Sequence, residues 1–433
     1  MQRHTRCSSA VEAATARAEA LRYNFISCLI LAAQNGFGRD VEPFLALSRE
    51  TWREEILFDA VKDLPHGALQ KRGAFGALMY ERNAHGQLVR DAHRNQIPAM
   101  DPFGKQRTRL MYAAQAGDVA RLTWLLARGA RLELKDWQGQ TALFWAAREG
   151  RVATVRELLA RGAVVDAANE EDWTPLFIAC ERGHLEVVRE LLARGAAVDA
   201  ANEVGSTPVY IASEAGRVEV VCELLARGAA VDVANEDGWT PLYIASEEGH
   251  VEVVRELLGR GAAVDAATDE DGWAPLFIAS RMGHVEVVRE LLGRGATVDA
   301  AANDGSTPLC TASEEGHVEV VRELLGRGAA VDAVMEDGLT PLCIASQEGH
   351  FEVVQELLGR GATVDAAMNF GRTPLQVASA RGHVEVVREL LARGALPALA
   401  AEDGTTALTI ASGCGHVAIV QLLRAARGLR AHE

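Results

Sequence analysis

Seven histidines recur along the chain at intervals of 33 or 34 residues, with one interval of twice that length. They are His184, His250, His284, His317, His350, His383 and His416. Imidazole is the commonest side-chain ligand for metals. If each interval is one helical unit, neighbouring histidines lie on the order of 10 Å apart, whereas zinc ligands lie about 2 Å from the ion. No two of them can then share a metal ion. We expect these side chains to form hydrogen bonds at turns between helices, and we expect no metal or other cofactor.

Acidic residues also recur in short clusters, and paired carboxylates can act as general acid and general base in hydrolysis. The clusters are Glu170–Asp172, Glu236–Asp237, Asp269–Asp271 and Glu336–Asp337. Such chemistry needs carboxyl groups that converge in a closed pocket, and these clusters fall at turns that should be exposed and separate. The chain also contains no G-x-x-x-x-G-K-[ST], H-E-x-x-H or G-x-S-x-G motif. We therefore expect a binding protein and not an enzyme.

Both residue sets follow a longer repeat, whose clearest part is Thr174-Pro175-Leu176. It returns at Thr207, Thr240, Ala274, Thr307, Thr340 and Thr373. The step is 33 residues throughout, except for one step of 34 in which Thr268 is interpreted as an inserted residue. Weaker copies at Thr108, Thr141 and Thr406 extend the register to about ten units over residues 103–433.

Each unit is expected to form two short antiparallel helices and an extended return. Thr174 suits an N-cap, and Pro175 suits the first helical position that follows it. The second helix, Leu185–Leu192, carries apolar residues at helical spacing, and Gly195 supplies a left-handed residue after its end. A single unit cannot bury its leucines alone, so neighbouring units must stack.

The order T-P-L-x-x-A, then G-H-x-E-V-V-x-x-L-L-x-x-G-A, at this period resembles the ankyrin repeat. The resemblance covers about three-quarters of the chain. It implies an all-α repeat solenoid, in which helix-turn-helix units stack and are joined by β-hairpin-like loops. Two departures stand out. Aromatic residues or cysteine replace the family's histidine after T-P-L, and aspartate replaces its usual asparagine before the turn, as at Asp199 and Asp232.

Residues 1–102 are expected to form a small helical N-terminal region ahead of the array. Leu29–Gly36 echoes Leu110–Gly117, so residues 29–47 form either a degenerate ankyrin-like unit or an unrelated helical pair. A further helix is expected over Thr51–Val61. Phe44–Ile56 also matches an F-box motif poorly.

Aromatic residues provide the candidate anchors for a partner. Trp173, Trp239 and Trp273 lie just before the T-P-L element, and we expect them to be exposed. A second set lies just after it: Phe144, Phe177, Tyr210, Tyr243 and Phe277. In ankyrin arrays, as the resemblance implies, the hairpins and first helices line the groove that holds partners, and aromatic residues there can act as binding hot spots. The competing interpretation of the second set is packing between neighbouring units.

The end of the first helix varies between units that are otherwise nearly identical. The candidate binding residues at this position are Glu181, Glu214, Glu247, Glu248 and Arg281. Positions that differ between nearly identical units are not needed for folding, so they are available to bind a partner.

Charge and cysteine usage restrict the class of partner and the cell compartment that we expect. The net charge is −16, and residues 1–104 hold 13 basic and 12 acidic residues, so the excess acid belongs to the array. This balance disfavours nucleic acid and favours a protein partner that binds through a basic segment. Seven scattered cysteines indicate a protein of the cytoplasm or nucleus, and no apolar run is long enough to span a membrane. We also expect the protein to be a monomer.

Two functions remain open at this point. The first is a scaffold or adaptor that binds a partner segment through the concave face of the array. The alternative is a substrate-recognition adaptor of a ubiquitin ligase or kinase complex, in which residues 1–102 recruit the catalytic partner.

Overall fold

The structure, a computed structural model, describes residues 107–430 of the chain. Within this range every regular element is a helix, apart from one antiparallel bridge between Ala400 and Thr406. The helices proposed for residues 29–47 and 51–61 and the F-box-like segment at residues 44–56 lie outside the described residues. The chain divides into two compact units: the first runs to Pro175 and includes Ala193–Gly195, and the second holds Leu176–Leu192 and the residues from Ala196 onward.

The helices come in pairs, one pair for each repeat. In the first unit they are α6 (Arg109–Ala116), α7 (Val119–Ala127), α8 (Ala142–Arg148) and α9 (Val152–Ala160). The next helices are α10 (Pro175–Arg182), α11 (Leu185–Ala193), α12 (Pro208–Glu214), α13 (Val218–Ala226), α14 (Pro241–Glu247), α15 (Val251–Gly259), α16 (Pro275–Arg281) and α17 (Val285–Gly293). They are followed by α18 (Pro308–Glu314), α19 (Val318–Gly326), α20 (Pro341–Glu348), α21 (Phe351–Gly359), the 3₁₀ turn η2 (Asn369–Gly371), α22 (Pro374–Arg381), α23 (Val384–Ala392), α24 (Ala407–Gly413) and α25 (Val417–Arg430).

The first helix of each pair begins where the threonine–proline motif predicts. The Thr207 side chain accepts a hydrogen bond from the Tyr210 amide, and Thr240 accepts one from Tyr243. Proline occupies the first helical position, where its missing N–H costs nothing. α16 is the exception, because Ala274 stands at its N-cap and offers no oxygen to the free amides.

The core of the second unit lies between and within the pairs. The leucine after proline is fully buried in each motif, as at Leu242 and Leu309, and so is the alanine three residues later, as at Ala245 and Ala312. A small side chain at that position lets first helices of successive repeats approach closely. Each first helix from α12 onward packs against the next first helix and against its own second helix.

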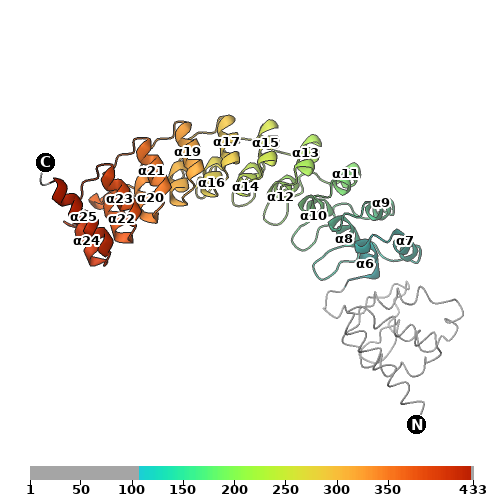
Figure 1. Cartoon of the computed structure of the whole chain (residues 1–433). Helices are drawn as coiled ribbons and strands as arrows, with labels where there is room; N and C mark the ends of the chain where they lie inside the picture. The colour runs from blue at the N-terminus through green and yellow to red at the C-terminus, as the bar shows by residue number, and fades with distance from the viewer. Residues whose placement is uncertain (1–106, 431–433) are drawn as a thin grey trace, which may run out of the picture. The chain divides into compact units, whose positions relative to one another are not determined.

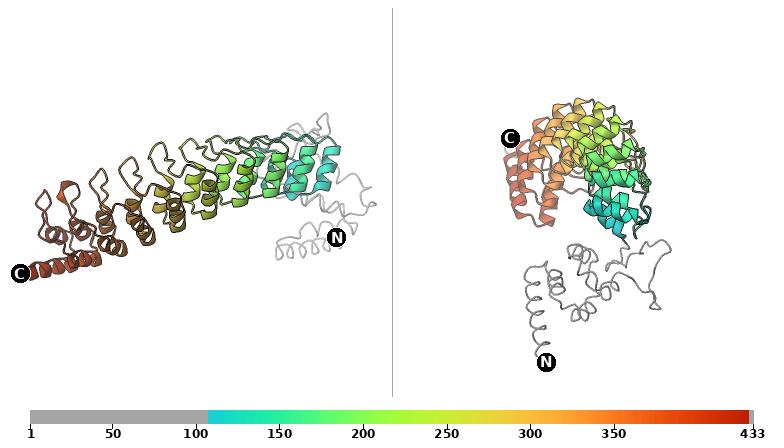
Figure 2. Two further views of the ribbon diagram at one scale, coloured as in Figure 1. Left: turned by 90° about the horizontal axis from the view of Figure 1, so that it is seen from above. Right: turned by 90° about the vertical axis from the view of Figure 1, so that its right-hand side faces the viewer.

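The second unit therefore consists of two rows of helices (Figure 1). First helices, such as α12, α14 and α16, line the inner side of the curve of this unit, and second helices, such as α13, α15 and α17, line the outer side. The hairpins project from one edge of the helices (Figure 2). This arrangement gives the unit an inner face, an outer face and a hairpin edge.

A histidine joins each repeat to the one before it. The Nε2 atom of His317 lies 2.9 Å from the carbonyl oxygen of Arg281, and that of His350 lies 2.7 Å from the carbonyl of Glu314. The same bond is made by His250, His284, His383 and His416. The acceptor is a carbonyl at the end of a first helix, which has no partner inside that helix. Six of the histidines thus form the predicted hydrogen bond at a turn between helices.

The histidine ring also explains why the G-H motif of the preceding repeat carries a glycine. Gly316 has φ +78°, a conformation that favours glycine, and a Cβ there would lie 2.5 Å from the ring of His350 in the next repeat. Arginine takes over this role twice, since Arg151 Nε donates to the Gln115 carbonyl and Arg217 Nε to that of Glu181. The contact thus needs a flat donor group as well as a glycine.

Aspartates before the turn form a second link between repeats. Asp199 accepts a hydrogen bond from the Ala230 amide of the following repeat at 3.1 Å, and Asp232 accepts one from the Ala263 amide at 3.1 Å. Asp265, Asp299, Asp332 and Asp365 do the same. The aspartates at this position therefore contribute to stacking by accepting from a backbone amide of the next repeat.

The single inserted residue lies in a hairpin tip and is not Thr268, as the sequence interpretation had it. The Thr268 amide donates to the Trp273 carbonyl at 3.1 Å, just as the Asn235 amide donates to the Trp239 carbonyl. Thr268 therefore occupies the regular position, and the additional residue falls within Asp269–Asp271. A solvent-exposed tip absorbs an extra residue at little cost.

Ion pairs link the second helices along the outer face. Arg289 contacts Glu286 of its own helix and Glu323 of the next repeat, and Glu323 also binds Arg327. Equivalent pairs join Arg189 to Glu223, Arg255 to Glu290 and Arg322 to Glu356. The negative charge of this face is therefore largely matched by arginine.

We predict that four glycines lower the stability of the middle repeats. Gly259, Gly293, Gly326 and Gly359 each end a second helix, without positive φ, and a Cβ there would meet no atom within 4 Å. Each Gly→Ala substitution should raise the free energy of unfolding by up to about 1 kcal/mol. Urea unfolding of the single and quadruple variants measures the gain, and native-state hydrogen exchange should show these repeats opening first in the unsubstituted protein.

Gly261→Ala is the matched control for this prediction. Gly261 also has open space around its Cα, but its φ is +91°, so alanine should destabilise the protein there. Equal effects at Gly259 and Gly261 would show that backbone conformation does not decide the outcome.

A second stability prediction concerns Ala274. Restoring threonine at this N-cap should stabilise the protein by about 1 kcal/mol, because a free amide of α16 gains an acceptor. Thermal unfolding of Ala274→Thr beside Ala274→Val, which adds bulk without an oxygen, separates the cap from packing. A valine variant as stable as the threonine variant would contradict the capping explanation.

Candidate partner-binding site

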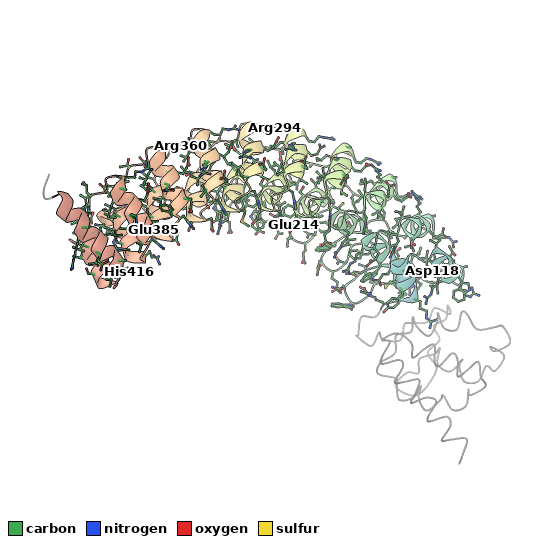
Figure 3. All side chains as sticks on the ribbon, viewed as in Figure 1. Asp118, Glu214, Arg294, Arg360, Glu385 and His416 are labelled. Carbon is green, nitrogen blue, oxygen red and sulfur yellow. The ribbon has the colours of Figure 1, made fainter. Side chains whose placement is uncertain are left out.

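The variable residues at the ends of the first helices lie on the inner face. Glu214 ends α12, Glu247 ends α14, Glu248 caps α14, and Glu181 and Arg281 fall in the last turns of α10 and α16. Figure 3 shows Glu214 on the inner side of the second unit, opposite Arg294 and Arg360 on the outer side. The recurrence of one helix position in stacked repeats therefore brings these side chains into one row.

The five aromatic residues after T-P-L belong to the core, which decides between the two interpretations. Phe144, Phe177 and Tyr243 are 1% exposed, and Tyr210 and Phe277 are 5% exposed. They stand in the first turn of the first helix, where the side chain points between neighbouring helices. The rings are thus not available as anchors for a partner, and the interpretation that they pack between neighbouring units holds.

Two of these residues nevertheless bring a polar group toward the inner face. The hydroxyls of Tyr210 and Tyr243 make no hydrogen bond to the part of the chain that the structure describes. Burial raises the pKa of Tyr210, and the charges of Glu214 and Glu247 raise it further. The pKa of Tyr243 is raised by burial and then by Glu247, while Arg281 opposes this effect.

The tryptophans before T-P-L are half-buried, so the expectation that they are exposed is only partly met. Trp239 stacks on Tyr243 with ring centroids 5.6 Å apart, and Trp273 stacks on Phe277 at 5.3 Å. The Arg281 guanidinium lies 5.0 Å from the Trp273 ring. One face of each indole is covered by its own repeat, and the remaining surface is accessible.

The hairpins hold the tryptophans through a side-chain oxygen. Asn235 Oδ1 accepts from the Trp239 amide at 2.9 Å, and Thr268 Oγ1 accepts from the Trp273 amide at 3.0 Å. In the first unit Asn169 holds the Trp173 amide in the same way at 2.7 Å. Partly exposed aromatic rings on a fixed backbone can bind a partner with little loss of conformational freedom.

The glutamates form a cluster whose charges act on one another. Burial raises the pKa of Glu214, and the charges of Glu248, Glu181 and Glu247 raise it further. Burial and Glu248 also raise the pKa of Glu247, while Arg281 lowers it. Like charges that raise one another's pKa are an unfavourable arrangement that a bound cation would relieve.

Two arginines flank the cluster. Arg182 Nε lies 3.4 Å from Glu181 Oε2, a buried oxygen that receives no hydrogen bond, and Arg281 Nε lies 3.9 Å from Glu315. Glu214 stands between them, and it forms no ion pair with any residue that the structure describes. The middle of the row therefore carries the least compensated negative charge.

Sequence reasoning missed several exposed apolar residues of the hairpins, among them Trp137 and Phe370. Phe370 is 75% exposed and has φ +67°, an unusual conformation for an aromatic residue. The signal was present in the repeat, because the equivalent tips at Asp237, Asp304 and Asp337 carry aspartate. Asp172 was missed in the same way: it has φ +58° at a position that other hairpins fill with glycine.

Other kinds of site find no support in residues 107–430. No group of three or more histidine, cysteine or acidic side chains there could hold a metal ion. No helix in that range is long and apolar enough to cross a membrane. The five cysteines of this range, including buried Cys180 and exposed Cys414, are unpaired.

Comparison with known families gives one match. The family model described as ankyrin repeats in three copies matches residues 77–169, 164–235, 211–302, 295–368 and 363–431. These segments together span residues 77–431, well over half of the chain. A comparison with curated proteins finds no match.

Proposed function

Because the chain belongs to the ankyrin repeat family, we propose that it is an adaptor or scaffold that binds a segment of a partner protein along its inner face. Ankyrin repeats are generally modules for protein–protein interaction, and proteins built from them are typically not enzymes. The observation that carries the proposal is the row of glutamates with little compensation, beside half-buried Trp239 and Trp273. The glutamates give specificity by charge, and the tryptophans give apolar contact.

The proposal includes the chemistry and the location of the partner. A basic segment complements the glutamates of the inner face, whereas nucleic acid, with its phosphates, does not. The unpaired cysteines support a reducing compartment, the cytoplasm or nucleus. The outer face, where arginine matches glutamate, offers no comparable charge to a second copy of the chain, so we expect a monomer.

The alternative function assigns recruitment of a ubiquitin ligase or kinase to residues 1–102. These residues lie outside the described range, so no described contact favours this role. Capture from cell extract by the full chain and by a chain that lacks residues 1–102 separates the two functions. Loss of an associated ligase or kinase with retention of the substrate would favour the alternative.

We predict that the tryptophans contribute to partner capture. A chain with Trp173→Ala, Trp239→Ala and Trp273→Ala should lose at least about tenfold in affinity for proteins that the unsubstituted chain enriches. Quantitative affinity capture followed by titration of the enriched partner measures the loss. Circular dichroism must show that the helices remain intact, since Trp239 also packs on Tyr243.

Trp124→Ala provides the control for this prediction. Trp124 lies on the second helix α7 and is 43% exposed, so it is an accessible tryptophan at a different helix position. Its replacement should leave capture unchanged. Equal capture by the triple variant and the unsubstituted chain would remove the tryptophans from the binding site.

A further inference from the structure

The glutamate row of the inner face has a built-in spacing. Glu181, Glu214 and Glu247 occupy the same helix position in three successive repeats, 33 residues apart. First helices that pack side by side have axes about 8–10 Å apart. The row therefore presents a negative charge about every 10 Å, and Glu248 adds a fourth carboxylate at its far end.

The row also has ends. Arg182 lies against Glu181 at 3.4 Å, and Arg281 stands at the corresponding position in the repeat that follows Glu247. Four carboxylates thus face two guanidiniums, and the guanidiniums lie at the margins. A partner that carries positive charge is attracted to the middle of the row and repelled at Arg281, which limits the site to about two intervals.

Polar groups without partners point to a ligand at the middle of the row. The Tyr210 side chain is 5% exposed, its hydroxyl makes no hydrogen bond within residues 107–430, and it feels the charges of Glu214 and Glu247. The Tyr243 hydroxyl likewise makes no hydrogen bond to the described residues, and it interacts with the charge of Glu247. The buried oxygen of Glu181 lies 3.4 Å from Arg182 Nε but receives no hydrogen bond from the described residues. The rings of both tyrosines are buried while their hydroxyl oxygens keep access to the surface, so the hydroxyls can accept hydrogen bonds from a donor that binds there.

Resting on the proposed function, we propose that Glu181, Glu214, Glu247 and Glu248, with the hydroxyls of Tyr210 and Tyr243, bind cationic side chains that stand at every third position of an extended partner segment. A polyproline II segment rises about 3.1 Å per residue and turns once every three residues, so every third side chain lies on one face about 9 Å apart. This spacing matches the row. A short helix would need charges seven residues apart, and short peptides rarely form helices before binding.

The ammonium of lysine and the guanidinium of arginine share the chemistry that this site recognises. Each donates several hydrogen bonds and accepts none, as the free carboxylate and hydroxyl oxygens require. Binding must also depend on pH, since the cation binds the ionised form of Glu214. The charged or titratable groups around Glu214 are Glu181, Glu247, Glu248, Tyr210 and His250, whose Nε2 lies 3.0 Å from the Glu214 carbonyl oxygen. Protonation of the glutamates at acid pH removes the attraction for a cation.

The test uses the full chain and synthetic fluorescent peptides of about nine residues. One peptide repeats lysine-proline-proline, one repeats arginine-proline-proline, one holds its three lysines together, and one replaces lysine by glutamine. A longer, helix-forming peptide carries lysine at every seventh position. We expect the two peptides with every-third charges to bind most tightly, and we expect their affinity to fall with added salt and on acidification from pH 7 toward pH 5.

Three variants locate the site. Glu214→Gln should weaken the lysine-proline-proline peptide by at least about tenfold, because it removes a charged acceptor. Tyr210→Phe should weaken it by a smaller factor, since only a hydroxyl is lost. Glu348→Gln is the matched control: Glu348 ends α20 at a related position beyond Arg281, and its replacement should leave binding unchanged.

The outcomes separate this site from the proposed function. Equal binding of all peptides, no effect of Glu214→Gln, or tighter binding of the helical peptide would each overturn the site. If Glu214→Gln leaves partner capture intact while the tryptophan variant loses it, the adaptor function stands and the cation site falls. If neither variant changes capture, both proposals fail.

Discussion

The contact between a histidine ring and the glycine of the preceding repeat is the interaction on which the rest of the array depends. It supplies a donor to a carbonyl that the end of a helix leaves without a partner, as His317 does for Arg281. It also occupies the space that a side chain at Gly283 would need. The bond requires the proton on Nε2, because a carbonyl oxygen can only accept. Because the leucines of one repeat are buried only by its neighbours, every other element takes its position from this stacking.

The faces of the second unit differ in how their charges are used. On the outer face glutamate and arginine alternate between helices, so the charges stabilise stacking and leave little field outside. On the inner face the same kind of glutamate, at Glu214 and Glu247, has carboxylates for neighbours. The charges of Glu214 and Glu247 are therefore less compensated by arginine than the glutamates of the outer face.

The sequence predicted the parts of the structure that follow from local chemistry. The threonine cap, the proline after it, and the histidine bond at the turn each rest on groups within one repeat and its neighbour. The insertion was assigned to Thr268 because spacing alone does not show which residue keeps the hairpin bond to Trp273. Burial of Tyr210 and Phe277 was left open for a related reason: their position in the helix is local, but their surroundings belong to the next repeat. The cluster around Glu214 could be named from its variability, whereas the unbonded hydroxyls beside it depend on side-chain directions that no spacing gives.

The series of ion pairs along the outer face is interrupted, and the interruptions affect how the array can bend. Cys222 and Gln355 stand where other second helices carry the linking arginine, so Glu256 has no arginine from the preceding repeat and Gln355 reaches Glu389 only at 3.5 Å. Between α11 and α23 the ion pair from one second helix to the next is therefore absent at two boundaries between repeats. When a partner bends the array, the bending should concentrate at these two boundaries, because fewer ion pairs resist it there. Glu214 and Glu247 lie on the two sides of the first boundary, so a rigid ligand bound to both would limit bending at this boundary.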